Sequence, residues 1–269
     1  PSEEAGHAAL MALDKAMVDY NDHLFDVLVT APVSAESMKR AGLDFRGQMH
    51  YVAECFAEHA QAMNILVNGR MRIGLMTDNV AVKDIANAIT RETLTETIQG
   101  FAQTLKRDYR ISNPRVAVLA LNPEPGTEEK ETIKPVIEVL AEQKVNAFGP
   151  YTANHFFSNS MYDYFDGILA MYHDQGLAPF KALAMDEGVN YTAGLPVIRT
   201  SPAHGTAYDI AGKGIASEDS FRQAIYVAID VFRNRQREKE AHANPLRKQY
   251  YEKRDDSDKL KLDSVEEDL

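Results

Sequence analysis

Polar side chains directly follow four apolar runs that have the composition of buried strands. Because ligands of parallel α/β sheets bind beyond the carboxyl ends of the strands, these side chains are the first candidates for chemistry. They are Thr30 after FDVLV, Asp78 and Asn79 after RIGLM, Asn122 and Glu124 after RVAVLAL, and His173 and Asp174 after GILAM.

The pair His173 and Asp174 is the richest of these groups. A histidine beside an aspartate at a strand end can supply a metal ligand, or a general base that the carboxylate orients. The alternative is a turn whose side chains satisfy one another by hydrogen bonding. For Asn79 and Glu124 the alternative is loop capping, since amide and acidic side chains commonly form turns.

A stretch further along the chain is dense in hydrogen-bond donors. Its polar members are Lys181, Asn190, Arg199, Thr200, Ser201, His204, Gly205 and Thr206. Such a stretch suits an anionic ligand, because arginine offers a bidentate fork and lysine a point charge for a carboxylate or phosphate. The alternative is that Lys181 and Arg199 are surface charges. Neither a G-x-G-x-x-G after a strand nor a P-loop occurs, so the common nucleotide motifs give no support for a cofactor.

The elements that must position these residues alternate between helix and strand. Hydrophobic periodicity predicts helices over 2–20, 48–60, 82–109, 127–143 and 217–235, with strands over 25–32, 63–67, 72–76, 115–123 and 167–174, and an extended or looped segment over 189–201. This alternation predicts an α/β fold with a largely parallel sheet flanked by helices.

Composition excludes several classes of protein. The 269 residues correspond to about 1.8 typical domains. No apolar run approaches the length of a membrane span, and a single cysteine excludes a disulfide scaffold. A net charge of −11 argues against nucleic-acid binding. The expected partners are small molecules and protein subunits, and the expected location is the cytoplasm.

The two ends of the chain differ from its body. Residues 236–269 are rich in charge and poor in large apolar residues, which predicts a tail that is partly disordered or docked on a partner. Pro1 stands in place of an initiator methionine, so we expect the chain to begin inside a longer protein.

The sequence from residue 169 to 214 resembles the 4-hydroxythreonine-4-phosphate dehydrogenase (PdxA) family of pyridoxal phosphate biosynthesis. Five further segments occur in the order of that family: FDVLVTAPVS (25–34), LDFRGQMHY (43–51), VKDIANAIT (82–90), NPRVAVLALNP (113–123) and GPYTANHFF (149–157). The resemblance covers residues 1–235. It implies a catalytic region of two α/β subdomains with the active-site cleft between them, followed by the tail.

The resemblance also implies an activity. Members of the family are homodimers with the active site at the subunit interface, and they use NAD and a divalent metal, here zinc, magnesium, manganese or cobalt. They oxidise 4-phosphooxy-L-threonine, and the product loses carbon dioxide. The metal would lower the pKa of the substrate hydroxyl and stabilise the enolate.

Site residues follow from the same resemblance. His173 matches a metal ligand, whereas Lys181, Asn190 and Arg199 match substrate-binding positions. The loop with Ser201, His204, Gly205 and Thr206 matches the cofactor side. Lys181 and Asp174 are the expected catalytic residues.

Other positions depart from the family pattern. The substrate motif Gly-His-Thr-Glu is Gly47-Gln48-Met49-His50, so Gln48 and Met49 occupy substrate-binding positions, and Met49 cannot replace a hydroxyl donor. Asn79 and Glu124 stand where the family has metal-binding histidines, which shifts the preference from zinc towards harder ions. Two hypotheses follow: an enzyme with an altered metal or substrate, or a non-catalytic paralogue that keeps the fold, the dimer and ligand binding.

Overall fold

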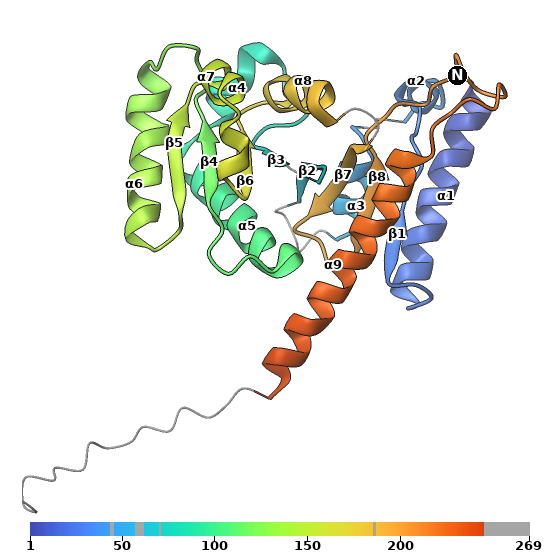
Figure 1. Ribbon diagram of the computed structural model, residues 1–269. Coiled ribbons are helices and arrows are strands. Elements are labelled where there is room, and N and C mark those ends of the chain that lie inside the picture. The colour runs from blue at the N-terminus through green and yellow to red at the C-terminus, as the bar shows by residue number, and fades with distance from the viewer. Residues whose placement is uncertain (44–45, 57–61, 70, 185–186, 245–269) are drawn as a thin grey trace, which may run out of the picture.

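The computed structural model describes residues 1–43, 46–56, 62–69, 71–184 and 187–244. Its centre is one mixed sheet of eight strands in the order β1-β8-β7-β2-β3-β6-β4-β5, with helices on both faces (Figure 1). The α/β fold with a mostly parallel sheet is therefore confirmed, and one continuous sheet runs through both halves of the chain.

The strands are short and the helices vary widely in length. The strands are β1 (Val27–Val29), β2 (Met63–Val67), β3 (Arg72–Leu75), β4 (Val116–Leu119), β5 (Ala147–Tyr151), β6 (Gly167–Ala170), β7 (Val189–Ala193) and β8 (Ile198–Pro202). The α-helices are α1 (Glu3–Asn21), α2 (Ala35–Arg40), α3 (Gln48–Glu54), α4 (Ile85–Ala88), α5 (Arg91–Tyr109), α6 (Lys134–Glu142), α7 (Ala153–Ser158), α8 (His173–Ala184) and α9 (Asp219–Ala243). Shorter helical turns are η1 (Val82–Asp84), η2 (Glu129–Ile133) and η3 (Met161–Tyr164).

Strand direction divides the sheet. β3, β6, β4 and β5 are mutually parallel, and β1 is parallel to β8. β2 is antiparallel to β3 and β7, and β7 is antiparallel to β8, so β1 and β8 run opposite to the β3–β6–β4–β5 group. The short connections 68–71 and 194–197 require the antiparallel pairing of β2 with β3 and of β7 with β8, since parallel neighbours need a long crossover. The carboxyl ends of the strands consequently do not all meet at one edge.

The two faces of the sheet carry different helices. α5, α6 and α9 pack on one face, where Phe101, Leu140 and Val231 are buried against strand residues. The other face packs against α7 and α8 in one half of the sheet, through Phe156 and Phe180, and against α1 and α3 in the other half. This second face is therefore covered by two separate groups of helices.

Most predicted elements are present, with informative differences. The strand expected over 167–174 ends at Ala170, and His173 begins α8. β5 was not predicted, because Gly149 and Pro150 within it are turn signals in the sequence. α9 continues to Ala243, past the expected domain boundary at residue 235. The rest of the predicted tail, 245–269, lies outside the described residues, and no helix of the described part is long and apolar enough to cross a membrane.

Candidate active site around Arg199

Alternation along β7 and β8 creates a polar surface on the face of the sheet opposite α9. Successive strand residues point to opposite faces. Tyr191 and Ile198 belong to the core beneath α9, so Asn190, Thr192 and Arg199 lie on the other face. The register pairs Thr192 with Arg199 and Asn190 with Ser201, which groups these polar side chains.

Arg199 is the centre of this polar surface. Its Nε and one terminal nitrogen donate hydrogen bonds to Thr30 Oγ1, at 3.1 and 2.8 Å. The guanidinium also donates to Thr192 Oγ1 at 3.2 Å, to Ser201 Oγ at 3.0 Å and to Gln48 Oε1 at 3.1 Å. All four partners are neutral, and no carboxylate of the described residues forms an ion pair with Arg199.

A buried cation without a counter-ion is costly. Arg199 is only 5% exposed, and this burial lowers the pKa of its guanidinium from 12.5 to about 10. The guanidinium therefore stays charged at neutral pH, held by hydroxyl and amide oxygens alone. An incoming anion would supply the missing opposite charge. The alternative of a surface charge is wrong for Arg199.

Arg199 lines a cavity of about 260 Å³. The cavity contains eight further residues that the sequence singled out: Gln48, Met49, Asp78, Asn79, Asn190, Ser201, His204 and Gly205. It also contains His50 and Asn64, which sequence reasoning missed as site residues. The signal for Asn64 was available, because it is the one polar residue in the strand MNILV. His50 Nε2 and Asn64 Oδ1 are buried and have no hydrogen-bond partner in the described part of the chain.

Local backbone geometry places Gln48 beside Arg199. Gly47 precedes α3 with φ of 114°, a conformation that favours glycine. Gln48 then donates from Nε2 to the carbonyl oxygen of Ala31 at 2.9 Å and accepts from Arg199 through Oε1. The amide is thereby held in one orientation. Met49 is buried in the cavity wall, where it contributes shape and no hydrogen bond donor.

Lys181 lies in a neighbouring cavity of about 200 Å³. Its Nζ donates to the carbonyl oxygen of Ala203. His204 lines both this cavity and the Arg199 cavity, so the two spaces adjoin at that residue. Thr206, the last residue of the predicted cofactor loop, is half-buried and belongs to the lining of neither cavity.

The predicted metal ligands lie beyond one edge of the sheet. Asn79, His173 and Glu124 follow β3, β6 and β4, three adjacent parallel strands. His173 Nδ1 is 2.8 Å from Asp174 Oδ1, Asn79 Nδ2 donates to the Arg46 carbonyl oxygen at 2.7 Å, and Glu124 is exposed. Within the described ranges, no three His, Cys, Asp or Glu side chains could together hold a metal ion.

A carboxylate that the sequence did not single out orders the loop after β4. Glu129 is buried and accepts hydrogen bonds from the backbone N–H groups of Asn122, at 2.8 Å, and Gly126, at 2.6 Å. Burial would raise the pKa of Glu129, but these bonds stabilise the charged form and the pKa is lowered. Glu129 fixes the loop that carries Glu124.

Residues 1–228 match the profile of the family described as pyridoxal phosphate biosynthetic protein PdxA. The chain belongs to this family. A protein of Bacteroides thetaiotaomicron named 4-hydroxythreonine-4-phosphate dehydrogenase is 57% identical over 274 residues, which cover 100% of this chain and 75% of the relative. The resemblance inferred from the sequence motifs is thus confirmed.

Solved structures with the same name share the PdxA fold of this chain. The 4-hydroxythreonine-4-phosphate dehydrogenase of Klebsiella pneumoniae superposes with a TM-score of 0.71 at 27% identity, over 86% of this chain and 72% of that one. The enzyme of Burkholderia phymatum gives a TM-score of 0.66 at 32% identity, over 86% and 71% of the two chains.

Proposed function

We propose that this PdxA family member is a dehydrogenase of small phosphorylated hydroxy acids. The substrate class includes 4-phosphooxy-L-threonine, whose hydroxyl would be oxidised with NAD before the product loses carbon dioxide, as a step of pyridoxal phosphate biosynthesis. One observation carries the proposal: Arg199 is a buried cation with only neutral partners, in a cavity that is open to a ligand. The names of the close relatives agree with it.

Each residue of the cavity takes a role that its contacts allow. Arg199 would bind a phosphate or carboxylate oxygen of the substrate through its guanidinium. Gln48 and Asn190 would orient the same molecule, because both line the cavity and Gln48 is fixed by Ala31. Met49 would shape the apolar side.

Oxidation of the substrate hydroxyl requires one acceptor for a hydride and another for a proton. The substrate carbon gives up a hydride, and its hydroxyl gives up a proton. Bound NAD would supply the hydride acceptor. We assign the proton transfer to Lys181, which lies beside His204 where the two cavities adjoin, and keep Asp174 as the group that orients His173. The loop with Ser201, His204, Gly205 and Thr206 would face the cofactor, since His204 and Gly205 are exposed at the Arg199 cavity.

A homodimer in the cytoplasm is part of the proposal. Among the described residues no three His, Cys, Asp or Glu side chains group together, so zinc, magnesium, manganese or cobalt would be held by His173 with Asn79 and Glu124 or with ligands from a second copy. Light scattering at falling protein concentration tests the dimer. Metal content of the purified dimer, compared with that of a His173→Ala variant, tests the metal.

The decisive experiment measures NADH formation from 4-phosphooxy-L-threonine and NAD with each of the four metals. Arg199→Gln removes the guanidinium, and Arg115→Gln is the matched control because Arg115 is an exposed arginine at the start of β4. We expect turnover that is abolished by Arg199→Gln and His173→Ala and unchanged by Arg115→Gln.

Binding of inorganic phosphate, followed by calorimetry, separates the two hypotheses. Phosphate binding that requires Arg199, without turnover under any metal, would identify a non-catalytic paralogue. The absence of both turnover and phosphate binding in a folded protein would overturn the assignment of the Arg199 cavity as a substrate site.

A further inference from the structure

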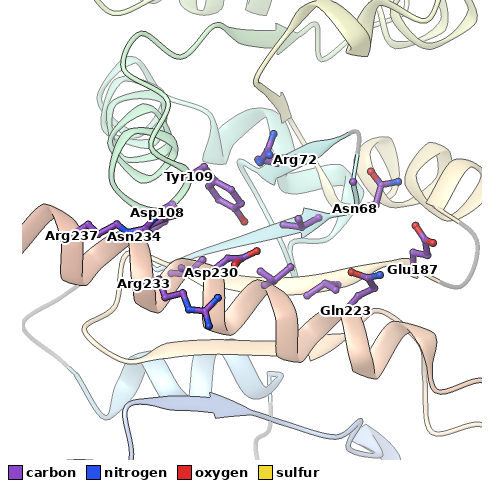
Figure 2. A pocket seen from close by; sticks show the side chains of 15 residues that line it. Asn68, Arg72, Asp108, Tyr109, Glu187, Gln223, Asp230, Arg233, Asn234 and Arg237 are labelled. Atoms are coloured by element: carbon purple, nitrogen blue, oxygen red, sulfur yellow. The ribbon is translucent and has the colours of Figure 1, made fainter.

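Another cavity, of about 510 Å³, lies on the opposite face of the sheet from Arg199. It is enclosed by α9, the end of α5 and the ends of β2, β3 and β7 that adjoin them (Figure 2). Val67, Val189 and Val231 of its wall belong to the core beneath α9. Asn190, the next residue along β7, lines the Arg199 cavity instead. The two cavities are thus separated by β7.

Three arginines and one aspartate gather at and behind the inner wall of this cavity. Asp108 is fully buried and forms bidentate hydrogen bonds with both Arg107, at 2.7 and 3.1 Å, and Arg235, at 2.8 and 3.2 Å. Arg72 adds a third guanidinium and forms no ion pair with a carboxylate of the described chain. Of these four charged groups, Arg72 and Asp108 line the cavity, whereas Arg107 and Arg235 lie behind Asp108.

Two polar groups of the wall have no hydrogen-bond partner. Arg72 Nε and Tyr109 Oη are both buried and both unpartnered among the described residues. The two side chains touch, because the Arg72 guanidinium carbon lies 4.5 Å from the centre of the Tyr109 ring. Burial raises the pKa of Tyr109 far above its ordinary value, so its hydroxyl keeps its proton and can donate. Two side chains in contact with each other thus each lack an acceptor among the described residues.

The mouth of the cavity is neutral overall. Glu187, Asp230, Arg233 and Arg237 are exposed around it, two of each sign. In Figure 2, Gln223 and Asp230 of α9 lie across the cavity from Arg72 and Tyr109. The lining as a whole has three arginines and three carboxylates, and Arg72, which has no carboxylate partner among the described residues, stands at the inner wall beside four valines at positions 67, 189, 227 and 231.

We propose that this cavity binds a small organic anion with an apolar body. Its carboxylate or phosphate group would accept hydrogen bonds from Arg72 and Tyr109, and its apolar part would pack on the valines. The volume is in the range of ligand pockets. This site would be separate from the Arg199 site and does not depend on the proposed activity.

Calorimetry on the full chain tests the site with benzoate and phenyl phosphate as anionic probes. Benzamide has the shape of benzoate without its charge. Tyr109→Phe removes the unpartnered hydroxyl and keeps the ring, and Arg72→Gln removes the charge. Tyr164→Phe is the matched control, because Tyr164 is an exposed tyrosine outside the cavity. Arg199→Gln eliminates binding at the other anion site.

We expect benzoate or phenyl phosphate to bind, and Arg72→Gln and Tyr109→Phe each to weaken binding at least about tenfold. Benzamide should bind at least about tenfold more weakly than benzoate. Arg199→Gln and Tyr164→Phe should change nothing. Tyr109→Phe should not lower the melting temperature, since its hydroxyl has no partner to lose. Wild-type affinity in both cavity variants, loss of binding in Arg199→Gln alone, or no binding of either anion would each overturn the proposal.

Discussion

The guanidinium of Arg199 donates two hydrogen bonds to one acceptor, the Thr30 hydroxyl, although the two residues are 169 positions apart in the chain. Parallel pairing of β1 with β8 produces this contact. Leu28 is the register partner of Arg199, and Thr30 is two residues further along on the same face. The strand end that the sequence marked as a candidate for chemistry thus serves to hold the cation.

Replacing Thr30 with valine should destabilise the protein. The variant keeps the shape of the side chain but leaves two donors of a buried cation without their acceptor, which costs about 1.5–3 kcal/mol in free energy of unfolding. Urea denaturation measures the change. Thr127→Val, at an exposed position in the helical turn before η2, is the matched control and should stay within about 0.5 kcal/mol of wild type. Equal stability of the two variants would show that Thr30 does not support Arg199.

Replacing Arg199 with lysine should weaken phosphate binding even though the charge is kept. A lysine ammonium is a point charge and cannot reproduce the planar fork that reaches Thr30, Thr192 and Ser201. We expect at least about a tenfold loss of affinity for inorganic phosphate by calorimetry, whereas Arg115→Lys should leave it unchanged. Retained affinity in Arg199→Lys would mean that charge alone, without directed hydrogen bonds, binds the anion.

Asp108 should contribute to stability at neutral pH and lose that contribution in acid. Burial would raise its pKa, but hydrogen bonds from Arg107 and Arg235 lower it below the ordinary value. Because the folded pKa is the lower one, the contribution is fully present above the unfolded pKa of about 3.9 and is lost as the pH falls through the folded pKa.

Asp108→Asn should therefore cost about 3–5 kcal/mol at pH 7, since two buried guanidinium groups lose their carboxylate. Its free energy of unfolding should also fall less steeply than that of wild type below pH of about 4. Urea denaturation at a series of pH values measures both effects. Asp209→Asn, at an exposed position, serves as control. Parallel pH profiles for wild type and Asp108→Asn would contradict the assignment.

Substitutions of Glu129 and Glu124 should differ sharply in their effect on stability, although the two residues are close in the chain. Glu129→Gln leaves a single acceptor oxygen for the N–H groups of Asn122 and Gly126, which should lower stability by about 1–3 kcal/mol and speed amide exchange over 122–126. Glu124→Gln, at an exposed position, should change stability by less than about 0.5 kcal/mol. Hydrogen exchange read by mass spectrometry would decide the matter; equal protection in both variants would show that Glu129 does not order the loop.

Restoring two histidines should increase zinc binding. The double variant Asn79→His, Glu124→His replaces an amide and a carboxylate by imidazoles, which suit zinc better, at one edge of the sheet with His173. We expect at least about a tenfold gain in zinc affinity by calorimetry, lost again when His173→Ala is added. An unchanged affinity would mean that these three positions do not converge on one ion.

The family of this chain and most of its helices and strands could be predicted from the sequence. Alternating apolar runs predict helix and strand, because burial on a face depends on local periodicity. The polar residues at the ends of those runs, and the donor-rich stretch around Arg199, follow from the same local pattern. The strand order and directions do not, since they depend on which distant segments pair.

Tertiary structure alone decided the environment of each side chain. The sequence left Arg199 open as either a surface charge or an anion ligand, and only the pairing of β8 with β1 and β7 buries it among Thr30, Thr192 and Ser201. The tertiary structure likewise places Lys181 in a neighbouring cavity and not in the Arg199 cavity. Burial and the set of neighbouring charges are sums over residues far apart in the chain, and so the chemistry of a charged side chain is fixed only when the chain has folded around it.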